Sequence, residues 1–502
     1  MYPPTETLDT FHVSVDLFLF SAGGRLLREK RSVFRSQDGI AQIVFGLIAT
    51  ELFQSGQEKL YEQGRKQRLT EAGMRLGGRL AAAIEVLEDI GRRHRPVADA
   101  LRDWGLSHRF AGGGDRAAIG NIVYDALRRK RSAGWLFGED TPRAIGFGAL
   151  LLEWGQTAQS LNDALDGDKF APPLLSATEL KAVAGRLPAD APDAVRADVP
   201  DWCAPLLEQA YGEDWVEEGA ALAMRPPLDL RVNALLSDRG RVLAELEGTG
   251  AAPAAIAPHG IRIPPIDGDG RHPNVQAEPA FQKGWFEVQD EGSQLAAALA
   301  GAMPGMQVLD YCAGAGGKTL ALSAEMGNTG QLFAHDAEKV RLAPIFERIR
   351  RAHSRNIQIV SKPAELTPLA SHMDIVLIDA PCTGSGTWRR RPDAKWRLTD
   401  RQLDARKGEQ QAILDAAQAF VKPGGLLVYI TCSVFDAENG EQVAAFRGRH
   451  GDFAPVDHRQ LWNSHFPGHE GAARIADAGG ISLSPALSGT DGFYFHALRR
   501  AA

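Results

Sequence analysis

The stretch MQVLDYCAGAGGKTLALS, residues 306–323, decides the fold of the largest part of this chain. Met306 to Asp310 form a short apolar run of the kind buried in a parallel sheet, and a helical pattern follows the glycines that end at Gly317. Glycines between a strand and a helix let the backbone approach a ligand and aim helix-terminal N–H groups at it. The stretch therefore predicts a strand, a ligand-binding loop and a helix.

This loop does not fit two common nucleotide-binding patterns. A P-loop requires glycine where Cys312 stands, and a dinucleotide fingerprint that starts at Gly314 requires glycine where Thr319 stands. Asp336, at the end of the next predicted strand, can accept both hydroxyls of a ribose. The arrangement favours a nucleoside and suits S-adenosylmethionine, and a glycine turn without a ligand is the alternative.

Four more apolar runs alternate with helical stretches after the first strand. They are QLFAH (331–335), IQIVS (357–361), DIVLID (374–379) and LLVYITC (426–432). Alternating strands and helices predict a doubly wound α/β domain, which we place at residues 281–500.

Two cysteines follow two of these strands. Ligands of open α/β sheets bind at the carboxyl ends of strands, so Asp379, Cys382 and Cys432 should face the crevice beside the glycine loop. Free cysteines are often only small buried hydrophobes, which is the alternative for each one singly. A thiol beside S-adenosylmethionine suits methylation of a pyrimidine at carbon 5, because a thiolate that adds to carbon 6 makes carbon 5 nucleophilic. Asp379 is placed to stabilise the charged adduct.

A basic and aromatic segment follows Cys382. A target base must leave its stack to react, which calls for such side chains around the pocket. We expect RNA contacts here, and a merely solvated basic loop is the alternative. The residues concerned are Trp388, Arg389, Arg390, Arg391, Lys395 and Trp396.

Residues 74–165 have a helical pattern and a local excess of positive charge. Between residues 74 and 131, 12 Arg or Lys stand against 7 Asp or Glu, although the whole chain carries 56 against 63 and a net charge of -7. We expect Arg128, Arg129, Lys130 and Arg131 to end a helix that opens near Asp115. At that position they either complement the helix dipole as a solvated helix end or contact an RNA phosphate.

The remaining boundaries follow from composition. Five prolines mark residues 166–200 as a linker with at most one short helix, and residues 201–280 predict a small α+β unit. Residues 1–73 remain unassigned. No stretch reaches the length and apolarity of a membrane helix, and the amino terminus lacks the pattern of a secretory signal. Four scattered cysteines, including Cys203, predict neither a disulfide framework nor a metal site, which indicates the reducing cytoplasm. We also expect the protein to be a monomer.

The sequence resembles the Nop/Sun family of RNA cytosine-5 methyltransferases from about Met74 to Arg500. The motifs that carry the resemblance are VQDEGSQL at Val288, DYCAGAGGKT at Asp310, DAPCTGSGTWRRRPDAKW at Asp379, YITCS at Tyr429 and GTDGFYF at Gly489. The resemblance implies a class I Rossmann-like methyltransferase domain, an all-α NusB-like RNA-binding domain with the stretch DRAAIGNIVYDALRRKR, and a small RNA-binding subdomain around Arg231. It implies S-adenosylmethionine as cofactor and structured RNA, ribosomal before transfer RNA, as substrate.

The family pattern also assigns roles to residues. It makes Cys432 the nucleophile and gives Cys382 a part in resolving the adduct, whereas the Pro-Cys motif of DNA methyltransferases would select Cys382. Asp379 contacts the cofactor or the target base, and the other cofactor contacts are Cys312, Ala313, Gly314, Ala315, Gly316, Gly317, Lys318 and Asp336. One departure is Pro363, near a position where the family has an acidic residue, so either Glu365 replaces that contact or it is absent. The alternatives are a non-catalytic RNA-binding assembly factor and, with less support, a DNA methyltransferase.

Met74 is the first methionine after Met1 and opens the helical pattern. We therefore expect translation to start at Met74, with a genuine accessory extension as the alternative. The intact mass of the natively expressed protein tests this, and a product that begins at Met1 contradicts it.

Overall fold

The five apolar runs form one parallel sheet in the computed structural model, which describes residues 13–20, 26–33, 73–476 and 479–502. Their order across the sheet is β9, β8, β7, β10, β11, so the strand order reverses at β7, and β10 is added on the side of β7 opposite to β8. Such a reversal opens a crevice at the carboxyl ends of the two strands. The strands are β7 (Gln307–Asp310), β8 (Gln331–His335), β9 (Ile357–Val360), β10 (Met373–Asp379) and β11 (Val421–Thr431).

Antiparallel strands extend this sheet beyond β11. β15 (Phe493–Arg500) pairs with β11, and β14 (Gly480–Leu483) pairs with β15. β13 (Arg474–Ala476) borders β14, and β12 (Phe453–Pro455) pairs with β15. The carboxyl-terminal GTDGFYF motif thereby enters the sheet next to the strand that carries Cys432.

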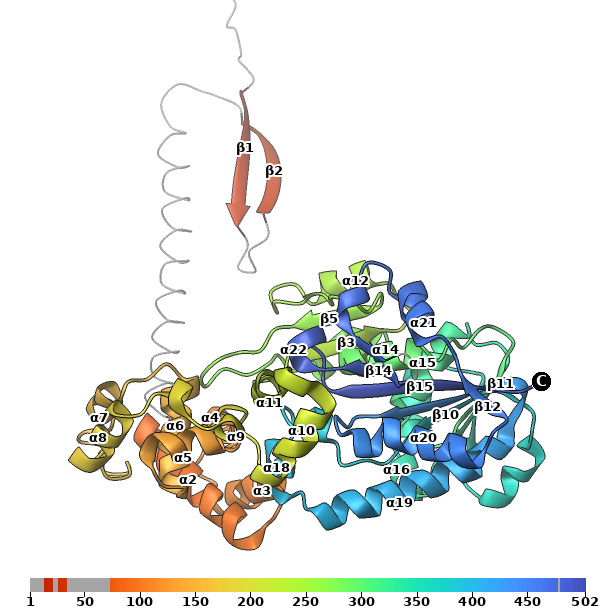
Figure 1. Cartoon of the computed structure of the whole chain (residues 1–502). Coiled ribbons are helices and arrows are strands. Elements are labelled where there is room, and N and C mark those ends of the chain that lie inside the picture. Colours follow the sequence, from red (N-terminus) through yellow and green to blue (C-terminus); the bar gives the residue numbers. More distant parts are fainter. Residues whose placement is uncertain (1–12, 21–25, 34–72, 477–478) are drawn as a thin grey trace, which may run out of the picture. The chain divides into compact units, whose positions relative to one another are not determined.

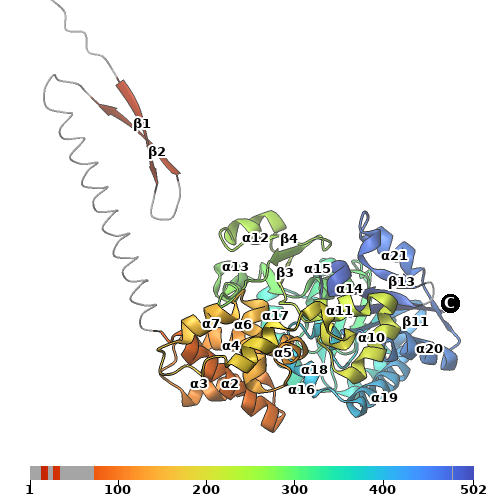
Figure 2. The same ribbon diagram turned by 60° about the vertical axis from the view of Figure 1, so that its left-hand side comes forward.

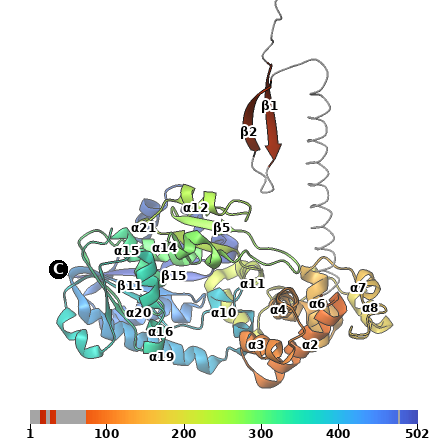
Figure 3. The same ribbon diagram turned by 180° about the vertical axis from the view of Figure 1, so that it is seen from behind.

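Helices cover both faces of the sheet, because alternate residues of each strand point to opposite sides (Figures 1 and 3). Val308, Leu377 and Val428 pack in one buried cluster with α14 and α15, whereas Leu309 and Val376 pack in another with α19 and α20. The helices are α14 (Glu291–Ala298), α15 (Gly317–Glu325), α16 (Lys339–Leu342), α17 (Ile345–Ala352), α18 (Pro392–Arg397), α19 (Asp400–Ala417), α20 (Gly440–Arg449), α21 (His458–His465) and α22 (Pro485–Ser488). The doubly wound domain predicted from the sequence is confirmed.

The residues after Met74 form a helical bundle, as their pattern predicts (Figure 2). Ile119, Ile122 and Val123 of α4 are fully buried in its core. Pro96, Gly112 and Pro142, which interrupt the helical pattern of the sequence, lie at helix starts. The helices are α2 (Leu76–Arg93), α3 (Val97–Ser107), α4 (Gly113–Arg128), α5 (Lys130–Phe137), α6 (Pro142–Glu153) and α7 (Ala158–Leu165). The run Arg128 to Arg131 was expected to end one helix, but it spans the junction of α4 and α5.

The segment 166–200 has more structure than we expected. It contains two helices, α8 (Ala177–Ala184) and α9 (Asp193–Arg196), so the prediction of at most one short helix is wrong. The missed signal is a capping box, in which Ser176 and Glu179 each accept a hydrogen bond from the other's backbone N–H. Asp198 then fastens the segment to the bundle by accepting hydrogen bonds from the backbone of Arg131 and Ser132.

The small α+β unit contains a four-stranded antiparallel sheet of order β4, β5, β3, β6. Its strands are β3 (Leu228–Val232), β4 (Ala252–Pro253), β5 (Gly260–Ile263) and β6 (Phe286–Val288), with α12 (Arg239–Glu245) and α13 (Pro279–Gln282) beside them. β6 lies beyond the boundary that we predicted at residue 280, because its pairing with β3 completes the sheet. The preceding helices, α10 (Ala204–Tyr211) and α11 (Trp215–Leu222), pack instead with Trp388 and Phe435 of the large domain.

The chain divides into two compact units, residues 1–73 and 74–502. In the first, the alternating apolar residues of Val13–Phe20 form β1, which pairs antiparallel with β2 (Leu26–Val33). The charged run from Glu58 to Arg68 lies outside the described residues. Among the residues that are described, no helix has the length and apolarity needed to cross a membrane.

Candidate active site

The glycine loop between β7 and α15 is a tight turn. Gly314 and Gly316 have positive φ angles of 50° and 83°, which side chains disfavour. A Cβ atom on Gly316 would lie 2.4 Å from Cγ1 of Ile345, so α17 packs directly on the loop. The loop therefore leads directly into α15, which starts at Gly317.

Asp336 fixes this loop from the end of β8. Its Oδ2 accepts a hydrogen bond from the backbone N–H of Gly314 at 3.0 Å, and its Oδ1 accepts one from the backbone N–H of Glu338 at 2.9 Å. The side chain is buried, and Arg341 lies 3.5 Å from Oδ2. A carboxylate held against the glycine loop fits the ribose of a nucleoside cofactor.

Asp310 adds a second buried carboxyl group under the loop. Its Oδ2 accepts a hydrogen bond from the Thr319 hydroxyl at 2.7 Å, and its Oδ1 has no hydrogen-bond partner. Burial raises the pKa of Asp310 to about 7, and the charges of Asp379 and Asp336 act in the same direction. This concentration of acidic groups suits a positively charged sulfonium such as that of S-adenosylmethionine.

Lys318 links the glycine loop to the end of β10. Its Nζ lies 2.7 Å from Oδ2 of Asp379 and 5.2 Å from the ring centroid of Phe493, and the side chain is only 6% exposed. The Asp379 side chain keeps 36% of its area exposed. The ammonium orients a carboxylate that remains accessible from the crevice.

The Cys382 and Cys432 thiols meet, as their positions after β10 and β11 predict. Their Sγ atoms are 3.3 Å apart, and both residues are partly exposed. The pKa of Cys382 is raised well above the ordinary value by the hydrogen bond to Cys432, by burial and by the nearby charge of Glu438. Cys312 and Cys203 are buried, and burial raises the pKa of both thiols. Cys382 and Cys432 are thus the two partly exposed thiols.

Comparison with known proteins agrees with this geometry. Residues 298–499 match the model of the 16S rRNA methyltransferase RsmB/F family, and residues 199–265 match the RsmF/B-like ferredoxin-like domain. The probable ribosomal RNA small subunit methyltransferase B of Synechocystis is 34% identical over 310 residues, which cover 60% of this chain and 67% of that relative. The chain belongs to the RsmB/F methyltransferase family.

A second relative and a solved structure show how much of the chain is matched. Ribosomal RNA small subunit methyltransferase B of Erwinia tasmaniensis is 34% identical over 303 residues, which cover 59% of this chain and 65% of that relative. The matched part thus spans about two thirds of the length of these relatives. The crystal structure of PH0851 shares the fold, with a TM-score of 0.63 and 24% identity over 85% of this chain and 100% of that one.

Family membership confirms three predictions from the sequence: the α/β methyltransferase fold, the methyltransferase class of enzyme, and S-adenosylmethionine as cofactor. The residues of the glycine loop fit that cofactor, because they combine a side-chain-free backbone with buried carboxylates. The ferredoxin-like match covers β3 to β5 of the small sheet. Glu365, the possible substitute for the missing acidic contact, is exposed and accepts a hydrogen bond from the backbone N–H of Ser361.

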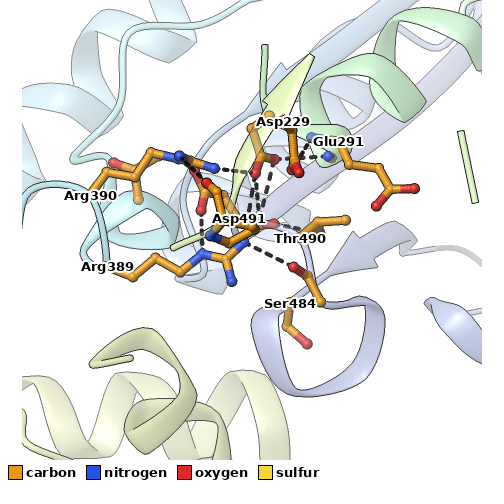
Figure 4. A network of polar contacts seen from close by, with 12 residues as sticks. Asp229, Glu291, Arg389, Arg390, Ser484, Thr490 and Asp491 are labelled. Atoms are coloured by element: carbon orange, nitrogen blue, oxygen red, sulfur yellow. Dashed lines mark hydrogen bonds and ion pairs between the residues drawn. The ribbon is translucent and has the colours of Figure 1, made fainter. Parts of the chain in front are cut away.

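Two of the arginines that we expected to contact RNA, Arg389 and Arg390, bind carboxylates of the chain itself. Arg389 and Arg390 both donate to Asp491, and Arg390 also donates to Asp290 at 2.7 Å. Figure 4 shows the two guanidinium groups converging on Asp491. Arg389 is buried, and Asp491 is 1% exposed. Among the cations of this segment, Arg391 is exposed.

The same network extends to the small α+β unit. Asp229 of β3 accepts two hydrogen bonds from Arg262 at 2.7 and 2.8 Å and one from the backbone N–H of Glu291 at 3.0 Å (Figure 4). Asp290 and Glu291 therefore connect the arginine segment to the small sheet. Sequence reasoning missed Asp290 and Asp491 as structural partners, although both lie in the quoted motifs VQDEGSQL and GTDGFYF.

Lys395 and Trp396 join the large domain to the helical bundle. Nζ of Lys395 donates to the backbone carbonyl of Asp198 at 2.6 Å and lies 3.4 Å from that of Arg128, and the residue is 1% exposed. The indole of Trp396 donates to the carbonyl of Leu127 at 2.7 Å. Burial lowers the pKa of Lys395 to about 8. These side chains hold two parts of the fold together, with Lys395 buried and Trp396 partly buried.

The cations at the junction of α4 and α5 also have partners within the chain. Arg128 donates to Asp125 and to the carbonyl of Arg389, so two segments predicted to bind RNA contact each other. The other ion pairs are Arg129 with Glu153 and Asp198, Lys130 with Asp140, and Arg131 with Asp201. Arg231 is buried and donates to Oε1 of Gln289 at 2.6 Å, and burial lowers its pKa to about 10. RNA contact by these five cations stays a prediction.

Replacing Lys395 by Met should destabilise the fold by about 1–3 kcal/mol, because the carbonyls of Asp198 and Arg128 lose a buried donor. The unfolded chain keeps the lysine proton up to pH 10.5, whereas the folded chain releases it near pH 8. Between these values the folded state binds fewer protons, so its stability relative to Lys395→Met should rise with pH. Urea unfolding followed by circular dichroism from pH 7 to 10 measures this difference.

The matched control is Lys407→Met, which changes a partly exposed lysine that pairs with Asp404 on α19. It should alter the free energy of unfolding by less than about 0.5 kcal/mol at every pH. A Lys395→Met variant as stable as the control would contradict the assigned role.

Proposed function

We propose that this protein methylates carbon 5 of a cytosine in small-subunit ribosomal RNA, through a covalent adduct of Cys432 and with S-adenosylmethionine as methyl donor. The observation that carries the proposal is the 3.3 Å approach of the Cys382 and Cys432 Sγ atoms at the mouth of the crevice. The names of the relatives from Synechocystis and Erwinia tasmaniensis support ribosomal RNA as the substrate.

The thiol pair accounts for a reaction in two stages. Carbon 5 of cytosine is a poor nucleophile, so the Cys432 thiolate first forms a bond to carbon 6, and the electron pair of the ring double bond moves to carbon 5. S-adenosylmethionine supplies an electrophilic methyl group to that carbon. A base then removes the carbon 5 proton, the double bond re-forms and the Cys432 thiolate leaves.

The environment of Cys382 supports different roles for the two thiols, with Cys432 as the nucleophile and Cys382 active in resolving the adduct. Its hydrogen bond to Cys432 and its burial raise the pKa of Cys382, which favours the thiol form of this side chain. At 3.3 Å from the attacking sulfur, it is within reach of the adduct that Cys432 carries. Cys382 therefore takes part in proton movement while the adduct is resolved.

Asp379 serves the ring of the target base in this scheme. Lys318 holds one carboxylate oxygen, and the side chain keeps 36% of its area exposed at the end of β10. A carboxylate that hydrogen-bonds the edge of the cytosine ring stabilises the charge that develops there. Asp336 and residues 312–318 hold the cofactor.

RNA binding beyond the active site is shared by several parts of the fold. We assign phosphate contact to the exposed Arg391 first, since it follows Arg389 and Arg390 outside their carboxylate network. The helical bundle acts as a NusB-like RNA-binding domain, and the ferredoxin-like unit with Arg231 as a second one. The partly exposed cations of the run Arg129 to Arg131 remain candidates for phosphate contact.

Changing Cys432 to Ala should abolish both the covalent adduct and methyl transfer, because no thiolate then reaches carbon 6. Changing Cys382 to Ala should trap a covalent protein–RNA adduct, because resolution fails while attack proceeds. Denaturing gel electrophoresis with radiolabelled RNA reports the adduct, and transfer of a labelled methyl group reports turnover. Turnover that survives in Cys432→Ala would overturn the assignment of the nucleophile.

Deleting the gene should remove one methylcytosine from the ribosomal RNA of the small subunit. Bisulfite sequencing of total RNA from the deletion strain detects the missing modification directly. Loss of a methylcytosine in transfer RNA alone would assign that substrate instead. Persistence of every modification would favour a non-catalytic assembly factor.

A further inference from the structure

Glu438 is a fully buried carboxylate beside the thiol pair. It ends a short helical turn, Asp436–Glu438, that follows β11, and its exposed area is 0%. Within the described part of the chain, no lysine, arginine or histidine lies within ion-pair distance of it. A buried charge without a counter-ion is costly unless hydrogen bonds satisfy it, so its presence needs a reason.

The hydrogen bonds of Glu438 connect the loops that carry the two cysteines. Its Oε1 accepts from the backbone N–H of Thr383 at 2.8 Å, and its Oε2 accepts from the Thr383 hydroxyl. Oε2 also accepts from the hydroxyl of Ser433. Thr383 directly follows Cys382, and Ser433 directly follows Cys432. One carboxylate therefore accepts hydrogen bonds from the residue after each cysteine.

A glutamine from α19 completes the set of donors. Nε2 of Gln410 donates to Oε1 of Glu438 at 3.0 Å and to the carbonyl of Pro381 at 2.9 Å. Pro381 directly precedes Cys382. The cysteine is thus flanked on both sides by residues that are tied to Glu438 or to its partner.

Direct bonds between the loops complete this arrangement. The backbone N–H of Gly386 donates to the carbonyl of Cys432 at 3.0 Å, and the hydroxyls of Ser385 and Ser433 lie 2.9 Å apart. These bonds reach Cys432 itself and the residue that follows it, but they come from residues three and four positions after Cys382. Glu438 instead accepts hydrogen bonds from the residue directly after each cysteine.

We propose that Glu438 is a positioning residue of the methyl-transfer reaction, which holds the Cys382 loop against the Cys432 loop so that the adduct on Cys432 can be resolved. The inference rests on the proposed function, because it assigns the thiols the roles given above. Glu438 does not touch the substrate in this scheme. It acts through the spacing of the two sulfur atoms, and an error of about 1 Å in such a spacing costs on the order of 100-fold in rate.

Two conservative variants separate the reach of the side chain from its charge. Glu438→Asp keeps the charge but is one methylene shorter, so it cannot hold both loops at once. Glu438→Gln keeps the reach and loses the charge, and the hydroxyls of Thr383 and Ser433 can turn to accept from the new amide. The matched control is Glu441→Gln, an exposed glutamate on the same segment that accepts only from Gln209 among the described side chains.

Each variant is assayed for folding, for S-adenosylmethionine affinity by calorimetry, for multiple-turnover methylation, and for covalent RNA adduct on denaturing gels. Glu438→Asp should fold, bind the cofactor with wild-type affinity, lose about 10- to 100-fold in turnover and accumulate adduct as Cys382→Ala does. Glu438→Gln and Glu441→Gln should stay within about threefold of the wild-type turnover and accumulate no adduct.

Cys382→Ala serves as the benchmark for the proposed function itself. If Cys382→Ala traps no adduct, the proposed function fails whatever Glu438 does. If Cys382→Ala traps adduct while a folded Glu438→Asp turns over like the wild type, the positioning role is overturned. If Glu438→Asp loses cofactor affinity or folding and accumulates no adduct, the residue has a general structural role and the positioning role is overturned. If Glu438→Gln loses all turnover, the charge of Glu438 is what matters, and the positioning role is likewise overturned.

Discussion

The parallel pairing of β10 with β11 is the constraint on which the active site depends. Asp379 lies opposite Ile430 in this register, so the chain leaves the two strands at the same level, and Cys382 and Cys432 follow within a few residues. Because β7 neighbours β10 on the other side, the glycine loop opens onto the same edge. A shift of register by one residue would turn the side chains of a strand to the opposite face. The pairing of these strands thus brings the two thiols, the glycine loop and Lys318 to the same edge of the sheet.

A second constraint is the pairing of buried charges around the crevice. Asp491 and Asp290 neutralise Arg389 and Arg390, and Asp229 does the same for Arg262. These pairs join the turn before β15, the segment after β10, α14 and the small sheet. Breaking one partner of a buried pair leaves an uncompensated charge, which makes such a network intolerant of change. The network fixes the small sheet relative to the catalytic domain.

Charge in the sequence was therefore an incomplete guide to function. The net charge of -7 and the local excess of positive charge in residues 74–131 are both real. Neither value tells which cations meet solvent, because Lys395 and Arg128 are buried and bonded to backbone carbonyls of other segments. An arginine-rich run has the same composition whether it binds phosphate or a carboxylate of its own chain. Only the partner that the fold supplies distinguishes the two.

By itself, the sequence determined the strands, the glycine loop and the convergence of two thiols. Local apolar runs and the rule that ligands bind at the carboxyl ends of parallel strands are sufficient for these features. The last strand of the small sheet and the burial of the basic segment were decided by tertiary structure. Each depends on contacts between residues far apart in the chain, such as β3 with β6 and Lys395 with Asp198. The role of Glu438 belongs with them, because a single glutamate in a sequence does not reveal that two distant loops will supply its hydrogen bonds.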